Sequence, residues 1–387
     1  MDIPIRVRSL LLQLFFFFML LKNAPLGAQE SAVPDPKIVD KAVKKGADFL
    51  VLKYWRTLDK GKWTSNAELV LLALSRARVR SEQSGFFQKI MEDLDTLPLE
   101  YTYRVALLAM TLESLDPVRY RERIAHCAQW LVDTQMEDGE WSYPHASPPI
   151  HVEPPLPTKE EESLPPVART FLIKKHSLTV TRKDKGDISN TQFALLGLRA
   201  CSDAGIQIPK STWESALSYF THAQNQDGGW GYCIGDAKPD ASYASITCAG
   251  VASLALCQSA MGRKNISDDP SIQAGLKWIG VHFSPSRNAN IEKRNALRCN
   301  WLYFYLYSVE RLGSLLNLKR LGDKEWYSSG VGYVLEQQRE NGSWLDNSDE
   351  STCSGIVDRE TVDTCFAMLF LRRGTHPLVN AEDPRHH

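Results

Sequence analysis

Two kinds of apolar segment alternate along the chain. In the first kind, apolar residues recur three and four positions apart, which predicts amphipathic helices with one wet face. These segments are 37–54, 118–135, 211–226 and 323–340, with weaker examples at 86–97 and 270–283. In the second kind, nearly every position is apolar, which predicts helices buried on both sides. These segments are 67–77, 102–115, 190–201, 245–260, 300–313 and 362–373.

The alternation predicts a repeated helical hairpin. Six hairpins share most of the chain, at roughly 60 residues for each repeat. A closed ring of six inner helices wrapped by six outer helices would give every buried helix neighbours on all sides. Because strand-like patterns are nearly absent, an α/β fold is disfavoured. We therefore predict an all-α fold with two concentric shells, in which all the inner helices begin at the same opening.

A short motif ends several of the amphipathic segments. It reads QMEDGEW at 135–141, QNQDGGW at 224–230 and QRENGSW at 338–344, with a weaker version, DKGKW, at 59–63. In QNQDGGW, Asp227, Gly228 and Gly229 are expected to end the helix, because glycine takes the left-handed conformation at low cost. Trp230 is then expected to fold back over the helix ends, while Gln224 or Gln226 bonds to carbonyls there. We interpret the tryptophan as structural.

This motif resembles the glutamine–tryptophan repeats of the squalene cyclase and protein prenyltransferase superfamily. The segments GDISNTQFALLGLRA (186–200) and VDTCFAMLFLRR (362–373) are also similar to inner helices of its bacterial members. The resemblance covers about residues 37–375 and implies an α/α-toroid, here a single one. It does not imply one activity, because a fold does not define a function.

The N-terminus differs from the rest of the chain. Arg6 and Arg8 precede an apolar run at 9–21, and small residues follow up to Ala28. The run is shorter than the roughly 20 residues of a spanning helix and is typical of an export signal. We predict a signal peptide at 1–28, a linker at 29–36, the toroid at 37–375 and a tail at 376–387. The protein would be periplasmic or extracellular, and membrane-anchored if the signal stays uncleaved.

One segment, 144–186, interrupts the helical pattern. Its first part is rich in proline, which is incompatible with a helix, and its second part suggests a short hairpin. The segment is expected at a rim of the toroid as a lid, as a disordered loop, or as an arm that docks a protein of the cell envelope.

The starts of the inner helices are the best place for a site. Their dipoles would point positive ends at one opening, a favourable setting for an anion. We expect ligand-binding residues there, although helix capping or packing would explain any single one of them. The candidates are Tyr103, Arg104, Asn190, Gln192, Thr247, Asn300, Trp301 and Cys365.

Asp363 is the leading candidate for a catalytic residue. Cyclases of the resembled superfamily protonate an alkene or epoxide with DxDD or DCTAE motifs, and neither motif is present. Asp363 would have to act as a lone acid. Prenyltransferase β subunits bind zinc through an Asp-x-Cys pair and a histidine. Asp363 and Cys365 have that spacing, but His376 lies at the far end of the same helix, so we predict neither a metal nor another cofactor.

The run WLYFYLYSVE (301–310) would supply bulk to a buried helix or aromatic faces to a cavity. The net charge of −1 provides no field for nucleic acid. The eight cysteines are scattered, and most are expected as small buried side chains, although export would permit disulfides.

These observations leave three functional hypotheses. The protein binds an apolar or isoprenoid-like molecule in a central cavity, it carries out lyase or isomerase chemistry at Asp363, or it is a non-catalytic scaffold.

Overall fold

The structure is a computed structural model. It describes residues 34–58, 66–78, 98–143, 171–176, 185–232, 240–293, 299–346 and 358–378. All of them belong to one compact unit, Pro34–His387, and the predicted signal peptide lies outside the described residues. The described residues hold eleven α-helices and two strands of two residues each.

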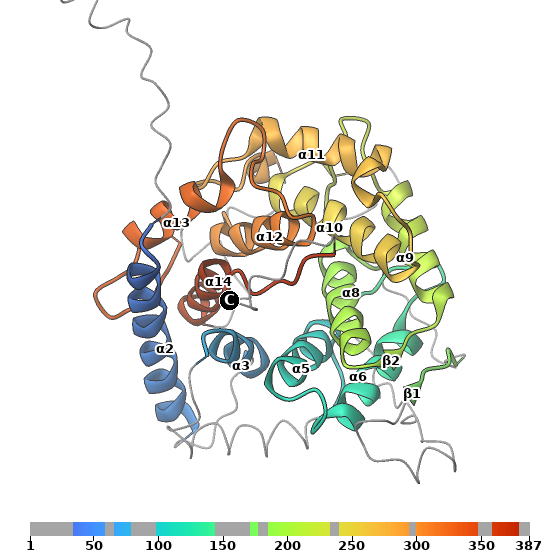
Figure 1. Ribbon diagram of the computed structural model, residues 1–387, viewed down its shortest axis with the longest axis horizontal. Helices are drawn as coiled ribbons and strands as arrows, with labels where there is room; N and C mark the ends of the chain where they lie inside the picture. Colours follow the sequence, from blue (N-terminus) through green and yellow to red (C-terminus); the bar gives the residue numbers. More distant parts are fainter. Residues whose placement is uncertain are drawn as a thin grey trace, which may run out of the picture. The chain divides into compact units, whose positions relative to one another are not determined.

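Six helices form a closed inner ring (Figure 1). Each packs against the next one along the chain, and the last packs against the first. They are α3 (Ala67–Arg76), α5 (Thr102–Leu115), α8 (Ile188–Asp203), α10 (Ala244–Ala260), α12 (Leu302–Leu315) and α14 (Arg359–Arg372). All six begin within three residues of the segments predicted to be buried on both sides. The prediction of a closed inner shell is confirmed.

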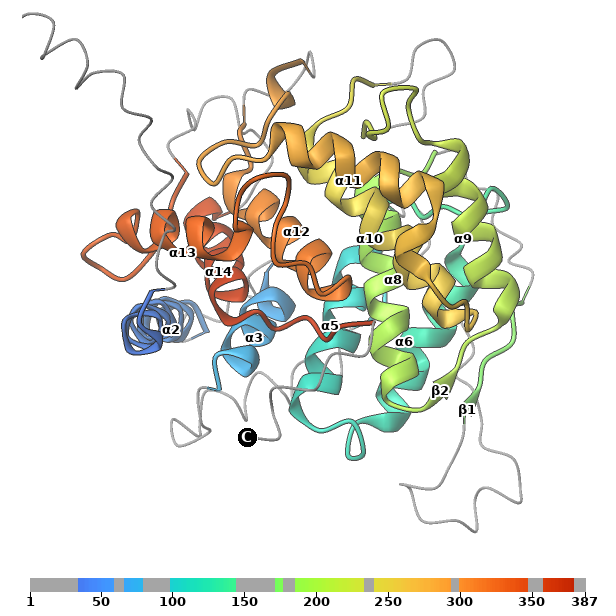
Figure 2. The ribbon, with the colours of Figure 1, turned by 45° about the horizontal axis from the view of Figure 1, so that its top comes forward.

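The amphipathic helices lie outside this ring (Figure 2). They are α2 (Pro36–Leu58), α6 (Arg121–Thr134), α9 (Lys210–His222), α11 (Pro270–His282) and α13 (Trp326–Glu336). Each packs on one or two inner helices, as α6 does on α5 and α8. The sixth predicted outer helix, at 86–97, lies outside the described residues.

The burial pattern explains why the two shells separate. On α10, every residue from Ala244 to Gln258 is buried, because α8, α9, α11 and α12 cover it from all sides. On α2, Val43 and Leu50 are buried whereas Lys41 and Lys44 are exposed. Burying one such aliphatic side chain contributes about 1.5–3 kcal/mol, so each amphipathic helix is held with its apolar stripe inward.

The three Gln-to-Trp segments share one geometry. Each tryptophan is fully buried and donates its indole N–H to the carbonyl ten residues earlier. These bonds join Trp141 to Leu131 (2.8 Å), Trp230 to Phe220 (2.9 Å) and Trp344 to Val334 (2.8 Å). The backbone N–H of each tryptophan also donates to a threonine in the first two turns of the next inner helix, respectively Thr191, Thr247 and Thr364. The tryptophan therefore fastens the end of an outer helix to the start of an inner one.

The glutamines of these segments link neighbouring repeats. Each side-chain amide donates to a carbonyl in its own turn and to one in the first half of the next outer helix. The second set of bonds runs from Gln135 to Thr212, from Gln224 to Ser271 and from Gln338 to Ala42, at 2.9 Å each. Because Ala42 belongs to α2, the last bond joins the final repeat to the first and closes the outer shell.

The glycine of each turn is required by its backbone. Gly139, Gly228 and Gly342 have φ values of 94°, 88° and 89°, a region that side chains with a Cβ rarely adopt. A Cβ at any of them would also meet the backbone of the next outer helix. Glycine therefore lets the turn reverse direction while two helices approach closely.

The insert is described only in part, so the predicted hairpin in its second half stays a prediction. Of its second part, β1 (Phe171–Leu172) is described, and it pairs in parallel with β2 (Ile206–Gln207), after α8, instead of with an adjacent strand. Residues 144–170 and 177–184 lie outside the described residues. No helix in the described part of the chain is both long and apolar enough to span a membrane.

Candidate functional site

The ring has two mouths. The starts of the inner helices gather at one, which we call the N-terminal mouth, as contacts between neighbouring starts show. Their ends gather at the other, the C-terminal mouth, where residues of all six inner helices line one cavity. The prediction that the starts share one opening is confirmed.

Three predicted ligand-binding residues at the N-terminal mouth bond to other residues at the starts of the inner helices. Arg104 pairs with Glu68 of α3, with 2.8 Å between Nε and Oε1. Asn190 donates to Asp187 from its backbone N–H (2.8 Å) and its side chain (2.7 Å), so Asp187 caps α8. The hydroxyl of Tyr103 contacts that of Ser189. Capping and pairing therefore use most of these polar groups, although the Asn190 side-chain oxygen has no partner among the described residues.

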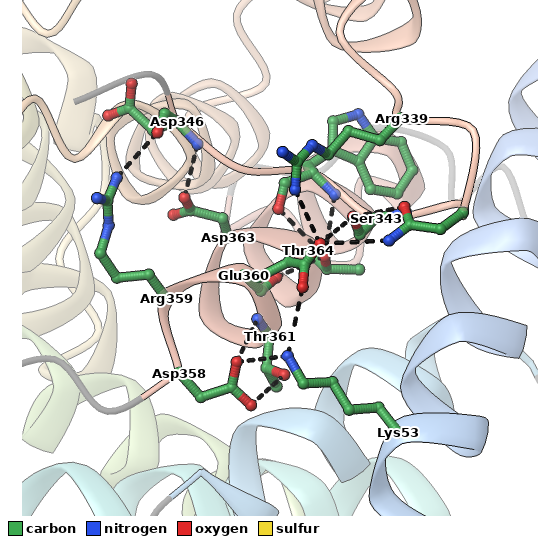
Figure 3. A network of polar contacts seen from close by, with 12 residues as sticks. Lys53, Arg339, Ser343, Asp346, Asp358, Arg359, Glu360, Thr361, Asp363 and Thr364 are labelled. Carbon is green, nitrogen blue, oxygen red and sulfur yellow. Dashed lines mark hydrogen bonds and ion pairs between the residues drawn. The ribbon is translucent and has the colours of Figure 1, made fainter. Parts of the chain in front are cut away.

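Asp363 lies at the start of the second turn of α14, among other polar residues near the start of this helix (Figure 3). Its carboxylate accepts the backbone N–H of Asp346 at 2.9 Å, and Arg359 donates to the Asp346 carbonyl at 3.0 Å. A separate group of bonds lies nearby around Asp358, which caps α14 and pairs with Lys53 of α2 at 2.6 Å. Asp363 thus sits where the last inner helix meets the final Gln–Trp turn.

Burial changes the acidity of Asp363. Its side chain is 5% exposed, and desolvation raises its pKa from the ordinary 3.8 to about 7. The backbone N–H of Asp346 opposes the shift, whereas the charge of the Asp346 side chain adds to it. A carboxyl group with a pKa of about 7 exchanges a proton readily near neutral pH, a property of general acids.

The remaining predicted residues have packing or bonding roles. Thr247 accepts the backbone N–H of Trp230, and Asn300 accepts two bonds from Asn288. The Cys365 thiol is buried and free, and burial raises its pKa well above its usual range. Trp301 precedes α12 in a left-handed conformation (φ 51°), which is uncommon for a residue with a side chain. Its ring lies 6.3 Å from that of Phe304.

A file of aromatic rings crosses the inside of the ring of helices. Neighbouring members lie between 4.5 and 6.4 Å apart, centroid to centroid. In order they are Tyr103 on α5, Phe193 on α8, Phe304 on α12, Phe366 on α14 and Tyr307 on α12. We call this set the aromatic file. It shows that the aromatic run at 301–307 sends some of its rings inward, where they meet rings from three other helices.

One cation lies against this file and was absent from the predicted site. Arg311 of α12 is fully buried, and its guanidinium carbon lies 4.2 Å from the ring centroid of Tyr307 and 5.0 Å from that of Phe193. Its Nη2 donates to Gln192 and Ser308 at 3.1 Å each, while Nε and Nη1 have no hydrogen-bond partner in the part of the chain that the structure describes. The sequence carried a signal for it: Glu310 and Arg311 interrupt an otherwise apolar inner helix. Of the predicted residues, Gln192 is the one that reaches Arg311.

A cavity of about 60 Å³ lies at the C-terminal mouth, with Tyr307 and Arg311 in its wall. Residues 373–378, which we call the strap, follow α14 and run across this mouth (Figure 1). Thr375 donates to the Glu310 carboxylate from its backbone N–H (3.2 Å) and its hydroxyl (2.8 Å). The backbone N–H of Leu378 donates to the Leu315 carbonyl (2.9 Å). The strap therefore forms part of the outer wall of the cavity.

Metal ligands are not gathered in the described part of the chain, where no three His, Cys, Asp or Glu residues are arranged to hold an ion. His376 lies at the C-terminal mouth, beside Arg76, and so at the opposite end from Asp363 and Cys365. Five described cysteines are free and buried, whereas Cys299 is disulfide-bonded.

Comparison with known proteins places the fold. No family model matches the chain, and no curated protein matches it. A structure of a variant of the type II terpene cyclase MstE from Scytonema, in complex with its substrate geranylgeranyl dihydroxybenzoate, is similar to it. The TM-score is 0.50, with 12% identity over 89% of this chain and 97% of that chain. A second MstE variant, in complex with the product merosterolic acid A, gives a TM-score of 0.51 with the same identity and coverage. The chain therefore has an α/α-toroid fold, which it shares with these type II terpene cyclase structures and which its Gln-to-Trp segments implied.

Proposed function

We propose that this protein binds an apolar, isoprenoid-like molecule inside the ring of inner helices. The aromatic file is the observation that carries the proposal. Its rings form a contiguous row inside the ring of helices, and Tyr307 brings this row to the wall of the cavity. Aromatic faces are good surfaces for chains with double bonds. Structures with the same fold hold an isoprenoid substrate and its product, which also supports it.

The size of the cavity defines what binding would require. About 60 Å³ is small beside the roughly 300–1,000 Å³ of typical ligand pockets. A prenyl chain would fit only if the strap or the rings of the file moved. We therefore expect ligand binding to be accompanied by exposure of the strap, which is measurable by hydrogen exchange of residues 373–378.

Native mass spectrometry and lipid extraction of the purified protein test the proposal. A co-purifying isoprenoid is expected, together with a higher melting temperature when such lipids are added. Ligand at 100 times its dissociation constant would add about 2.7 kcal/mol of stability. Repeated absence of lipid and an unchanged melting temperature would refute the proposal.

A matched pair of variants locates the binding surface. Phe366→Leu removes a ring from the file, whereas Phe220→Leu removes a buried ring from the outer helix α9. Both should cost similar stability, but only Phe366→Leu should weaken isoprenoid binding. Equal effects on binding would place the ligand elsewhere.

A second candidate is terpenoid cyclase-like lyase or isomerase activity, which the raised pKa of Asp363 supports. Incubation with linear polyprenes and analysis of the products by mass spectrometry tests it. Cyclic products that disappear in Asp363→Asn are expected. Products that persist in that variant would remove Asp363 from the chemistry.

A third candidate, a non-catalytic scaffold, is supported by the way the aromatic side chains already occupy the inside of the ring. It would use the segment 144–186 to hold an envelope protein, and most of that segment lies outside the described residues. Cross-linking in cells that express the wild-type protein or a variant without 144–170 distinguishes the scaffold from the ligand-binding function. Cross-links that are lost in the variant, with unchanged lipid binding, would favour the scaffold.

We also propose that the protein is exported through residues 1–28. The disulfide at Cys299 supports this, since disulfides persist mainly in oxidising compartments. The mass of the mature chain tests cleavage near Ala28, and fractionation tests the compartment. A reduced, full-length chain in the cytosolic fraction would overturn the proposal.

A further inference from the structure

We propose that the cavity at the C-terminal mouth is an anion subsite, in which Arg311 receives the carboxylate or phosphate group of an amphiphilic ligand. The inference rests on the proposed function, because it assigns the polar end of the molecule whose apolar part would lie along the aromatic file. It also gives that ligand a direction, with the charged end toward the strap and the apolar end toward the N-terminal mouth.

The first support is the state of Arg311 itself. Its side chain is fully buried in the cavity wall, yet two of its three guanidinium nitrogens have no hydrogen-bond partner among the described residues. An arginine stays charged at any physiological pH, and burying its charge without a counterion costs several kcal/mol. Such an arrangement persists where a site has been built for an opposite charge.

The second support is the charge balance around the cavity. Its other two arginines are already neutralised: Arg76 pairs with Glu113 at 3.1 Å, and Arg199 pairs with Asp203 at 2.7 Å. Glu310, the neighbour of Arg311 in sequence, directs its carboxylate to Thr375 and Ser314 instead. Burial lowers the pKa of Arg311, and the nearby Glu310 charge opposes this shift without forming a direct ion pair. Within the described part of the chain, Arg311 is therefore the arginine of this cavity that has no carboxylate at ion-pair distance.

The third support is shape. The guanidinium group presents parallel N–H donors in a plane, which match two oxygens of a carboxylate or phosphate. A cavity of about 60 Å³ holds a group of that size and excludes a whole prenyl chain. Tyr307 and Phe193 lie against the same guanidinium, so a chain attached to the anion would pass directly onto the aromatic file.

Isothermal titration calorimetry of the full mature protein with three probes tests the subsite. The probes are farnesol, farnesyl phosphate and inorganic phosphate, in a phosphate-free buffer. We expect farnesyl phosphate to bind about tenfold or more tightly than farnesol, because a charge-assisted hydrogen bond contributes that much. Equal affinity of the two farnesyl probes for the wild-type protein would overturn the subsite and leave the proposed function standing.

Two arginine variants assign the preference to a residue. Arg311→Gln should lower the affinity for farnesyl phosphate to that for farnesol, with a change of no more than about twofold for farnesol. Arg199→Gln, in the same cavity wall but paired with Asp203, should keep the preference. A folded Arg311→Gln protein that keeps the preference for farnesyl phosphate over farnesol would refute the assignment to Arg311.

If Arg311→Gln does not fold, Arg311→Lys replaces it as the test. This variant should retain the charge and lose part of the preference for farnesyl phosphate. A full preference in Arg311→Lys would refute the paired N–H geometry.

The probes separate failure of the subsite from failure of the proposed function. Binding of inorganic phosphate that is lost in Arg311→Gln, without binding of either farnesyl probe, would support the subsite and contradict the isoprenoid ligand. Binding of farnesol alone would do the opposite. Binding of no probe would contradict both.

Discussion

The two mouths of the ring differ in how their polar groups are satisfied. At the N-terminal mouth, Glu68 pairs with Arg104, Asp187 caps α8, and Asp363 accepts a backbone bond. At the C-terminal mouth, a fully buried arginine has two nitrogens without a partner in the described structure, beside a cavity. At the first mouth, the polar groups hold helix starts together, and we call this set of contacts the seam. At the second mouth, Arg311 has donors that a ligand could bind.

The helix dipoles alone would have suggested the reverse. Six helix starts favour an anion at the N-terminal mouth, but capping and pairing groups already occupy most of the donors there. Six helix ends favour cations at the C-terminal mouth, which helps to explain why Arg76, Arg199 and Arg311 lie near it. On the proposal made above, the unbonded donors of Arg311, rather than the helix dipoles, make the C-terminal mouth the site for an anion.

The largest effect is expected from breaking the seam. Trp344→Ala removes a fully buried ring that packs on Gly46 of α2 and should destabilise the protein by about 3–5 kcal/mol. Trp344→Phe, which keeps most of the bulk but loses the bond to Val334, should cost less than half as much. Urea unfolding of both variants measures this. An alanine variant as stable as the wild type would show that the turn does not hold the mouth together.

A pH experiment examines the buried acid of the seam. Because the folded-state pKa of Asp363 is raised, the folded state holds its proton between about pH 4 and 7 while the unfolded state releases it. Its contribution to stability is therefore complete at low pH and is lost as the pH rises to about 7. Asp363→Asn should remove a fall of about 2–4 kcal/mol between about pH 4 and 8. An unchanged pH profile, followed by unfolding midpoints, would mean that the acid is not perturbed.

Matched arginine substitutions compare the mouths directly. Arg104→Met leaves the Glu68 carboxylate, 4% exposed, without its partner and should cost about 1–3 kcal/mol. Arg311→Met removes a buried charge that has no carboxylate partner among the described residues, so stability should stay within about 1 kcal/mol of the wild type or rise. Thermal unfolding at one pH measures both. A larger loss from Arg311→Met than from Arg104→Met would reverse the comparison.

The smallest effect concerns the strap. Thr375→Val removes the hydroxyl bond to Glu310 and should cost about 1 kcal/mol, most of it as local opening of 373–378. Hydrogen exchange should show faster exchange at the Leu378 amide, while Thr221→Val on the exposed face of α9 serves as the control. Unchanged exchange at Leu378 would show that the strap is held by other contacts.

The helices, the turns between them and the division into two shells could be predicted from the residue pattern alone. Those features are local. The spacing of apolar residues indicates how many sides of a helix are buried, and a glycine followed by a tryptophan indicates a turn where the chain reverses direction. Asp363 could also be found in this way, because its position at the start of an inner helix is a local property. Its pKa of about 7 depends on burial among residues that the sequence does not place beside it.

Which polar groups meet, and which keep unbonded donors, depends on how the helices pack in three dimensions. The bond from Gln338 to Ala42 joins the last repeat to the first, and the bond from Arg311 to Gln192 joins α12 to α8 across the inside. A charge in a buried segment can be seen in the sequence, but whether a carboxylate lies within reach of it depends on how six helices close on one another. The two unbonded nitrogens of Arg311 and the cavity beside them could not be predicted from the sequence. Whether a buried donor has a partner depends on the side chains of all the helices that surround it.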